Sequence, residues 1–435
     1  MQVISILGYF VLFYPVLMVS VWIIGGLIFR LRWEDSEQPA SETNPLITIL
    51  VPAHNEEVVI EDTIHQLSKL TYPNYEVIVV DDGSTDNTAA ILKGLTSKYP
   101  RWLKALHLSP NSGKAKALNK AITLCKSEFI MIIDADCYLE KDALQYFVNH
   151  LQSSKRVGAV TGNARVRNRT TLLGKIQVGE YSFVIGMIKR AQRIYGRVLT
   201  VSGAVTAYRK KALLDVGCFD PDTVTEDIDV TWKLHKRFWD VRYEPRALCW
   251  VLVPETIKGL WGQRVRWAQG GIEVIMKHFH VLLEGRHRRL WPIYFEYVLG
   301  VIWAHLFIFL SVFLITCGLV DFIGKIWLIP AALDRAVLTA NAMSPTWSST
   351  RTILAFLCLG QFSVSLMLDK RYERHTSIAK PYYWIVWYPA IYWLINTFAC
   401  ISAVSRLFTR RSKICAAWES PDRGIQTKRS SIAQS

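Results

Sequence analysis

The N-terminal segment is the feature that most constrains this chain. From Ile4 to Phe29 the sequence reads ISILGYFVLFYPVLMVSVWIIGGLIF and carries no charge. This run exceeds the ~20 apolar residues that an α-helix needs to cross a bilayer. A signal peptide would have a positive start, a shorter apolar core and a small-residue cleavage site, which are missing here. We therefore predict a retained transmembrane helix over residues 1–30.

The charges beside this helix predict its orientation. Arg30 and Arg32 follow the apolar run directly, and no Lys or Arg precedes it. Cytoplasmic flanks of membrane helices carry an excess of Lys and Arg. We therefore expect the N-terminus outside and the next domain in the cytoplasm.

The overall composition agrees with a chain that lies partly in lipid. Hydrophobic residues make up 51% and charged residues 20%, a balance too apolar for a disordered chain or an ordinary soluble enzyme. Lys and Arg exceed Asp and Glu by 51 − 36 = 15, which suits nucleic acid, a membrane surface or anionic small molecules. The eight cysteines form no CxxC pair, and this disfavours a zinc site or a disulfide framework.

Residues 45–290 have the pattern of an α/β domain. Short β-rich runs at Ile47–Val51, Glu76–Val80 and Phe129–Ile133 alternate with helix-like stretches. Such alternation predicts a mostly parallel sheet with helices packed on it. Each of these runs ends in a polar turn, and ligands of open α/β sheets bind at the carboxyl ends of the strands.

The C-terminal part, residues 294–405, is again apolar. Three candidate spans are bordered by basic clusters, so much of the positive charge flanks the membrane, and no basic strip with interleaved aromatic residues indicates nucleic acid. The spans are Tyr297–Ile323, Thr352–Leu368 and Tyr382–Val404, and the clusters are Arg286–Arg289, Lys370–Arg371 and Arg406–Lys413.

The number of spans stays open at this point. Four spans in all would leave the basic tail, residues 406–435, outside, against the positive-inside tendency. Either a further span lies within Ile326–Thr346, or one candidate is interfacial or re-entrant.

Two motifs are candidates for binding a nucleotide. Asp81 and Asp82, in DDGSTD, follow the second predicted strand, where a carboxylate can accept hydrogen bonds from a base or a ribose hydroxyl. A simple Asp-Gly turn with Ser84 as a helix cap explains the same residues equally well. Lys114, in NSGKA, opens another predicted helix, where an ammonium group can hold phosphate, although so short a motif is weak evidence.

A second pair of aspartates has metal-ligand spacing. Asp134 and Asp136 follow the apolar run Phe129–Ile133, and two carboxylates at this spacing can bind one divalent cation that also holds a diphosphate. Strand alternation turns side chains at i and i+2 to the same side. The alternative is that both carboxylates only accept hydrogen bonds in a turn.

Two later motifs are candidates for catalysis and acceptor binding. Glu226 and Asp227, in TED, are a carboxylate pair in which Asp227 can act as general base, and a helix N-cap is the alternative. The QRVRW segment brings together an amide, two guanidinium groups and an indole, which can bind sugar hydroxyls, a diphosphate and a pyranose face. Its spacing is also typical of an amphipathic interfacial helix. The residues concerned are Gln263, Arg264, Arg266 and Trp267.

The order of these motifs is more specific than any one of them. PAHNEE, DDGSTD, DAD, TED and QRVRW, between apolar flanks, resemble the processive family 2 glycosyltransferases, which include cellulose, hyaluronan, chitin and poly-N-acetylglucosamine synthases. Longer stretches are similar to the bacterial poly-β-1,6-N-acetyl-D-glucosamine synthases of biofilm exopolysaccharide. These stretches are Val157–Asn163, Gly174–Gln177, Val224–Ile228, Tyr243–Ala247, Arg266–Gly271 and Ser420–Gly424.

The resemblance implies a fold, a reaction and partners. The fold would be a glycosyltransferase A-type domain with a mixed, mostly parallel sheet between transmembrane helices. The donor would be UDP-N-acetylglucosamine with Mg²⁺ or Mn²⁺, and inversion would add β-linked sugars to a growing polysaccharide. The enzyme would be a multi-pass protein of the bacterial inner membrane with a cytosolic catalytic domain and no nucleic-acid partner. A small membrane subunit is compatible with this interpretation.

The resemblance also implies a role for each motif residue. Asp82 would contact the uracil or ribose with Asp81 beside it, and Asp227 would be the general base. The other residues fall into two groups, with Lys114, Asp134 and Asp136 for the diphosphate and its metal, and Gln263, Arg266 and Trp267 for the acceptor end and the leaving diphosphate.

Two alternatives remain beside this interpretation. The first keeps the fold and changes the product, as in a hyaluronan, chitin or cellulose synthase or a non-processive transferase acting on a lipid carrier. The second is an inactive membrane scaffold that senses nucleotides. In the tail, Ser420–Gly424 is a candidate segment for closing over the donor site.

Overall fold

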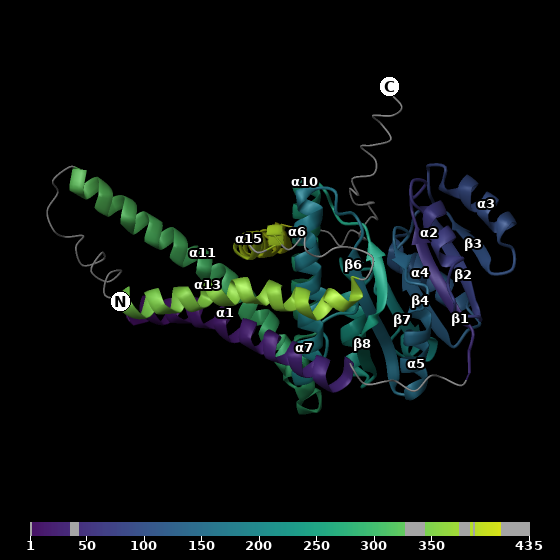
Figure 1. The fold of residues 1–435 in the computed structure, drawn as a ribbon, viewed down its shortest axis with the longest axis horizontal. Coiled ribbons are helices and arrows are strands. Elements are labelled where there is room, and N and C mark those ends of the chain that lie inside the picture. The colour runs from purple at the N-terminus through teal and green to yellow at the C-terminus, as the bar shows by residue number, and fades with distance from the viewer. Residues whose placement is uncertain (1, 35–42, 327–343, 374–382, 386–387, 410–435) are drawn as a thin grey trace, which may run out of the picture.

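The structure, a computed structural model, describes residues 2–34, 43–326, 344–373, 383–385 and 388–409. It has two parts, an α/β domain at one end and a group of long apolar helices at the other (Figure 1). The predicted tail segment at Ser420–Gly424 and most of the region around Ile326–Thr346 lie outside the described residues.

One sheet with the strand order β3-β2-β1-β4-β7-β6-β8-β5 forms the centre of the domain. Strands β3, β2, β1 and β4 are parallel, β7 is antiparallel to β4 and β6, β8 is parallel to β6, and β5 is antiparallel to β8. The prediction of a mixed, mostly parallel sheet is therefore confirmed. The strands are β1 Ile47–Ala53, β2 Tyr75–Asp82, β3 Leu103–Leu108, β4 Phe129–Ile133, β5 Tyr138–Leu139, β6 Val157–Val166, β7 Val205–Arg209 and β8 Asp240–Val251.

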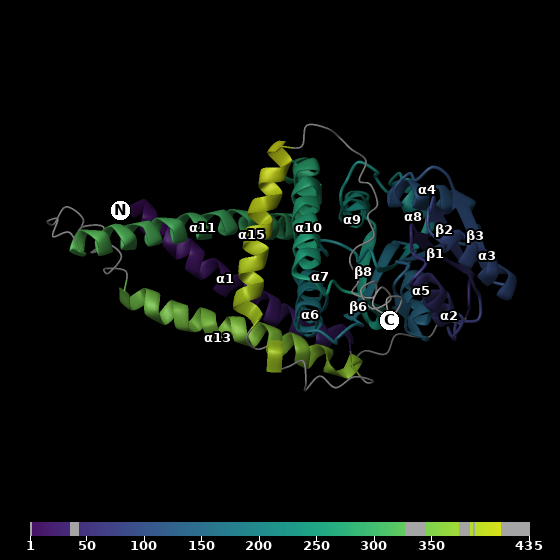
Figure 2. The ribbon, with the colours of Figure 1, turned by 90° about the horizontal axis from the view of Figure 1, so that it is seen from above.

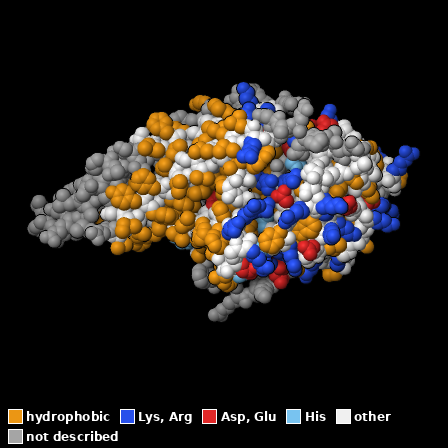
Figure 3. Space-filling model, turned by 90° about the horizontal axis from the view of Figure 1, so that it is seen from below, with side chains coloured by type: hydrophobic (Ala, Val, Ile, Leu, Met, Phe, Trp, Pro, Cys, Tyr) orange, Lys and Arg blue, Asp and Glu red, His pale blue; other side chains and the backbone are white. Residues whose placement is uncertain are grey.

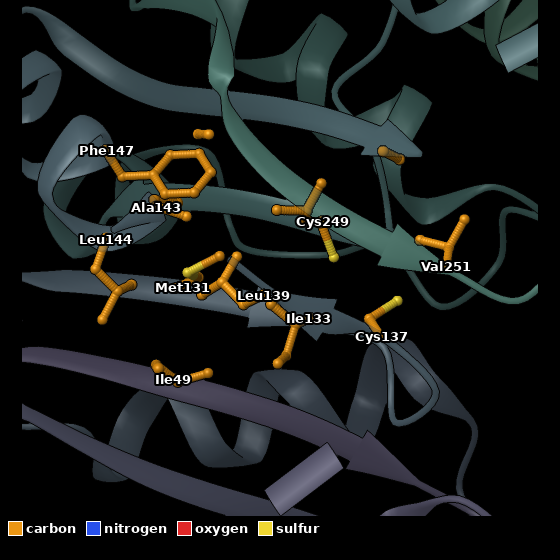
Figure 4. Close-up of a cluster of buried hydrophobic side chains, with 14 of the residues drawn as sticks. Ile49, Met131, Ile133, Cys137, Leu139, Ala143, Leu144, Phe147, Cys249 and Val251 are labelled. Atoms are coloured by element: carbon orange, nitrogen blue, oxygen red, sulfur yellow. The ribbon is translucent and has the colours of Figure 1, made fainter. Parts of the chain in front are cut away.

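Helices cover both faces of this sheet, and the central strands are therefore buried on both sides. On one face Ile49, Met131 and Phe147 belong to a core that includes α2, α3 and α5 (Figure 4). On the other face Leu50 and Ile130 pack with α4, α8 and α9. These helices are α2 Ile60–Leu67, α3 Thr88–Lys98, α4 Lys114–Leu124, α5 Ala143–Ser153, α8 Lys210–Asp215 and α9 Glu226–Lys236.

A layer of helices separates the sheet from the apolar end (Figures 1 and 2). One almost continuous helical stretch is made of α6 Leu172–Tyr181, the π-helical segment η2 Ser182–Ile188 and α7 Lys189–Tyr195. The other is α10 Ile257–Lys277, which carries the QRVRW motif and is followed by the short turns η3 Phe279–Leu282 and η4 Gly285–Leu290.

The apolar end consists of α1 Gln2–Phe29 with η1 Arg30–Glu34, α11 Trp291–Ile326, α13 Ser344–Asp369 with η5 Lys370–Tyr372, and α15 Tyr388–Thr409. Among the described residues, Val3–Glu34 and Gly285–Val320 are long and apolar enough to cross a membrane. Hydrophobic side chains dominate the surface of this end, whereas charged ones cover the α/β domain (Figure 3).

The last of these helices has a different direction from the others. In Figure 2, α1, α11 and α13 extend away from the sheet, whereas α15 runs crosswise to them and lies beside α10. Residues 388–404 of the predicted span Tyr382–Val404 therefore lie on a helix that runs beside α10.

Buried ion pairs join the apolar helices to the α/β domain. Arg190 of α7 binds Glu34 at 2.8 Å and Asp369 at 2.9 Å, and these three side chains are fully buried. Arg165 of β6 binds Asp369 at 2.5 Å and also pairs with Glu373. We refer to these five residues as the junction cluster. It connects the ends of α1 and α13 to the domain.

Candidate active site

A cavity of about 660 Å³ lies where the domain meets the apolar helices. The motifs from the sequence line its domain side, and residues of α1, α11 and α15 line its other side. The predicted site residues among its lining are Lys114, Asp134, Asp136, Glu226, Asp227, Gln263, Arg264, Arg266 and Trp267.

Asp81 and Asp82 lie behind the cavity wall rather than on it. The Asp82 carboxylate is fully buried and accepts hydrogen bonds from the backbone N–H groups of Ser112 and Gly113 at 3.0 and 2.7 Å. Asp81 accepts the N–H of Ser84 at 3.0 Å and contacts His107 at 2.9 Å. In this structure Asp82 therefore holds the loop that precedes α4, and Asp81 holds the turn after β2 against β3.

The glycine between these motifs makes this arrangement possible. Gly83 has φ +68°, a conformation that residues with a Cβ rarely adopt. A Cβ there would also lie 2.8 Å from the backbone nitrogen of Asn111. The turn after β2 and the loop before α4 thus pack backbone to backbone, which places the N-terminus of α4 at the cavity.

Lys114, the first residue of α4, connects two of the carboxylates. Its ammonium group lies 2.6 Å from Asp134 Oδ1 and 3.2 Å from Glu226 Oε1. Burial alone would lower the pKa of Lys114, but these two carboxylates outweigh it and raise the pKa above its ordinary value. A positive charge is therefore held at the N-terminus of a helix, a place suited to phosphate groups.

Asp134 and Asp136 fit a hard divalent cation. One oxygen of each carboxylate and the sulfur of Cys137 lie within 4.8 Å of one another. Carboxylate oxygens suit Mg²⁺ and Mn²⁺, whereas a thiol is a soft ligand that these ions disfavour. The pair therefore matches a site in which Mg²⁺ or Mn²⁺ is shared between two carboxylates and substrate phosphates. Both aspartates lie in the turn after β4, so this turn, and not the alternation of a strand, brings their carboxylates together.

Asp227 lies at the start of α9 and faces the cavity. Its Oδ2 accepts the N–H of Gly203 at 3.1 Å and its Oδ1 accepts the N–H of Ile228 at 2.9 Å. Burial, together with the charge of Glu226, raises the pKa of Asp227 to about 6, although Lys114 and Lys189 act in the opposite direction. A carboxylate with this pKa is ionised at neutral pH and is a stronger base than an ordinary aspartate.

The QRVRW residues on α10 separate into two roles. Arg264 is buried and binds Glu180 of α6 at 2.7 Å, and its guanidinium group stacks 4.2 Å from the centre of the Trp267 ring. Arg266 is exposed and lines the cavity with Gln263. Arg264 thus holds Trp267 in place, whereas Arg266 is available to a ligand.

Two glycines after this motif let other elements reach the backbone of α10. A Cβ at Gly270 would overlap the side chain of Thr225, the residue before the α9 carboxylates. A Cβ at Gly271 would overlap the ring of Tyr297 on α11. Close packing at these glycines therefore fixes α10 against the residue that precedes α9 and against an apolar helix.

Lys189, Gln192 and Glu296 are among the cavity residues that belong to no motif singled out in the sequence. Lys189 and Gln192 lie one turn apart on α7, and Glu296 lies on α11. Glu296 accepts hydrogen bonds from Trp22 at 2.9 Å and Tyr195 at 2.6 Å. Polar residues inside apolar helical segments were the available signal, but the sequence does not show that they meet.

Comparisons with known proteins show the family of this chain. Residues 44–270 match the model of the family described as "Glycosyltransferase like family 2". The chain therefore belongs to glycosyltransferase family 2. The glycosyltransferase is 38% identical over 425 residues to a poly-beta-1,6-N-acetyl-D-glucosamine synthase of Staphylococcus epidermidis, covering 95% of this chain and 98% of the relative. It is 37% identical over 421 residues to the enzyme of the same name from Staphylococcus aureus strain COL, with the same coverage.

A solved structure shows the same fold. The glycosyltransferase aligns with a mannosyltransferase from Pyrobaculum calidifontis in complex with GDP-Man and Mn²⁺, with a TM-score of 0.55 and 20% sequence identity. The alignment covers 84% of this chain and 100% of the mannosyltransferase. The glycosyltransferase A-type fold predicted from the sequence is therefore confirmed.

Proposed function

We propose that this glycosyltransferase polymerises N-acetylglucosamine from UDP-N-acetylglucosamine into β-1,6-linked poly-N-acetylglucosamine, an exopolysaccharide of biofilm, and passes the polymer across the membrane. The observation that carries the proposal is the single cavity shared by the catalytic motifs and by α1, α11 and α15. A transferase that releases its product into the cytosol has no need for such a wall. The resemblance to the staphylococcal synthases over almost the whole chain supports the polymer and its linkage.

The donor would bind where α4 begins. Lys114 and the N-terminus of α4 offer positive charge to the diphosphate, Asp82 positions the loop beside it, and Asp81 holds the neighbouring turn after β2. Asp134 and Asp136 would hold Mg²⁺ or Mn²⁺, which supplies stabilisation of the charge on departing UDP. We predict that Asp82 also contacts the nucleoside of the donor. Its carboxylate binds the backbone of Ser112 and Gly113 in this structure.

Asp227 would act as the general base. Gly203 fixes one oxygen of its carboxylate, and its raised pKa suits removal of a proton from the attacking hydroxyl at neutral pH. Glu226 binds Lys114, so it positions the ammonium group on the donor side. Attack from the side opposite UDP inverts the anomeric carbon and gives a β linkage.

The acceptor end would lie against α10. Arg266 and Gln263 face the cavity and can bind the leaving diphosphate and sugar hydroxyls, and Trp267 offers a flat surface for a pyranose ring. Arg264 supports this surface through its stacking on Trp267.

The membrane arrangement follows from the directions of the helices. We propose that α1, α11 and α13 cross the membrane and that α15 lies at its inner surface beside α10. Three crossings place the catalytic domain and the basic tail on the same, cytosolic side, as the positive-inside tendency requires. The enzyme would then be a multi-pass protein of the bacterial cell membrane, with room for a small membrane subunit on the apolar surface.

Product analysis tests the proposal directly. Membranes containing the protein are incubated with radiolabelled UDP-N-acetylglucosamine and Mg²⁺ or Mn²⁺, and the product is digested with a hydrolase specific for β-1,6-linked poly-N-acetylglucosamine. We expect a high-molecular-weight product that this hydrolase degrades and that a chelator prevents. A product degraded only by chitinase would contradict the linkage. Release of UDP without any polymer would contradict processive synthesis.

A further inference from the structure

A lysine that belongs to none of the motifs lies on the wall of the catalytic cavity. Lys189 is the first residue of α7, and only 5% of its surface is exposed. No hydrogen bond joins its ammonium group to another residue in the part of the chain that the structure describes, and the side chain lines the cavity. A mostly buried ammonium group is costly without a partner, and the cavity is where a ligand can supply one. The position therefore has a use beyond packing.

The groups around Asp227 show where this lysine acts. Asp227 is influenced by Glu226 from its own helix, by Lys114 from α4 and by Lys189 from α7, and Tyr208 of β7 senses the same carboxylates. Lys114 is already bound to Asp134 and Glu226, on the donor side. Lys189 is the second cation that reaches Asp227, and it does so from the intermediate layer of helices.

The rest of α7 places Lys189 on the acceptor side. Gln192 lies one turn further along and donates to Glu296 of α11 at 3.3 Å. Glu296 and Gln192 both line the cavity where it borders the apolar helices. Lys189 therefore lies between the base and the part of the cavity that leads away from the donor. An acceptor hydroxyl must approach Asp227 from this side, because UDP leaves from the other.

We propose that Lys189 is an acceptor-binding residue, whose ammonium group donates hydrogen bonds to oxygen atoms of the terminal sugar and holds the attacking hydroxyl against Asp227. This inference rests on the proposed function, since it takes Asp227 as the base. Its chemistry is that of a hydrogen-bond donor for a neutral, oxygen-rich ligand. The positive charge of Lys189 also favours the ionised form of Asp227, and burial in turn lowers the pKa of Lys189 to about 8.

The test compares Lys189→Met with wild type in the full-length, membrane-embedded enzyme. Methionine keeps the length of the side chain and removes the charge, so we expect the fold to survive. Polymer formation should fall at least about tenfold, whereas the affinity for UDP, measured by competition, should stay within about twofold of wild type. More UDP should be released per sugar incorporated, because water replaces the poorly held acceptor. Lys189→Arg should recover part of the activity.

Lys175→Met is the matched control. Lys175 lies on α6 and is not among the described residues that line the cavity, so its loss should change neither polymer formation nor UDP affinity. Wild-type rates in Lys189→Met would overturn the inference, and so would a loss of UDP affinity equal to the loss of polymer. If the wild-type enzyme itself makes no polymer while releasing UDP, the proposed function fails instead.

Discussion

The cavity cluster and the junction cluster both hold opposite charges, but they differ in how far their side chains are exposed to solvent. The cavity cluster consists of Lys114, Asp134 and Glu226, whose side chains are 21%, 33% and 18% exposed. In the junction cluster, the side chains of Arg190, Glu34 and Asp369 are 0% exposed. Both clusters join distant parts of the chain, but only the first is open to a ligand.

This difference has a physical consequence. Charges in the cavity can exchange one partner for another, since substrate phosphates or a cation can replace the protein groups that now pair with them. Charges at the junction have lost their water and can only keep their present partners. Breaking a sealed pair leaves an uncompensated charge, which costs far more than breaking an exposed one. We therefore expect changes in the cavity to affect turnover, and changes at the junction to affect folding.

The largest expected effect is on catalysis alone. Asp227→Asn keeps the shape of the side chain and removes the base, so polymer formation should fall about 10²- to 10⁴-fold. UDP affinity and thermal stability should stay close to wild type, because the other cavity charges remain. Radiolabelled polymer synthesis and UDP competition measure the two properties. Equal loss of both would indicate that Asp227 binds the donor or supports the fold.

A change in the junction cluster should lower the stability of the enzyme and leave its turnover unchanged. Arg190→Met removes the fully buried cation between Glu34 and Asp369 and leaves Asp369 with Arg165 and Glu34 with Arg371, so we expect a loss of about 3–5 kcal/mol in stability. Yield and melting temperature of the detergent-solubilised enzyme measure it, and turnover per folded molecule should remain near wild type. Arg286→Met is the control, since Arg286 binds Glu284 at the surface with 67% of its side chain exposed, and its loss should cost below about 1 kcal/mol. Stability equal to wild type in Arg190→Met would contradict the comparison.

The two arginines of QRVRW reproduce this contrast within one helix. Arg266→Gln should lower polymer formation by roughly tenfold or more with an unchanged melting temperature, because it removes a donor from the cavity. Arg264→Gln should lower the melting temperature, because Glu180 then lacks its buried cation, and should weaken activity through a loosened Trp267. Thermal melts and initial rates of both variants separate the two outcomes. Indistinguishable variants would show that the arginines act as one unit.

The pH profile should give the smallest and most graded effect. Polymer formation should rise as pH increases through about 6, where Asp227 loses its proton, with up to about tenfold change per pH unit below that value. It should fall again above about pH 8, where Lys189 loses its proton. UDP affinity measured at each pH is the control. Lys189→Met should lack the alkaline fall, and its persistence in that variant would assign the fall to another group.

Local patterns in the sequence predicted much of the fold and the site. The run Phe129–Ile133 is strand β4 with the same bounds, and Asp134 and Asp136 meet in the turn that follows it. The α/β alternation gave the sheet, and the apolar runs gave α1 and α11. These features depend only on neighbours in sequence, so they can be predicted from short windows.

Features that depend on distant residues were not predictable in this way. The junction cluster joins Glu34 to Arg190 and Asp369, which no spacing rule connects. Lys189 gives no motif, and its importance comes from its burial beside Asp227. Arg264 and Arg266 were assigned similar roles, yet residues two apart on a helix point about 200° apart, so Arg264 is buried and paired with Glu180 at the cavity wall, whereas Arg266 is exposed.

The two glycines of α10 have a mechanical consequence. Thr225, next to the base, rests on the backbone at Gly270, and Tyr297 of α11 rests on it at Gly271. Helix α10, which we propose to hold the acceptor, is thus in tight contact with Thr225 on one side and with Tyr297 on the other. We expect the sugar chain, and not this frame, to move between additions. The enzyme would then stay fixed while the polymer moves through it, and the geometry of α10 and its neighbours would set how far the polymer moves at each addition.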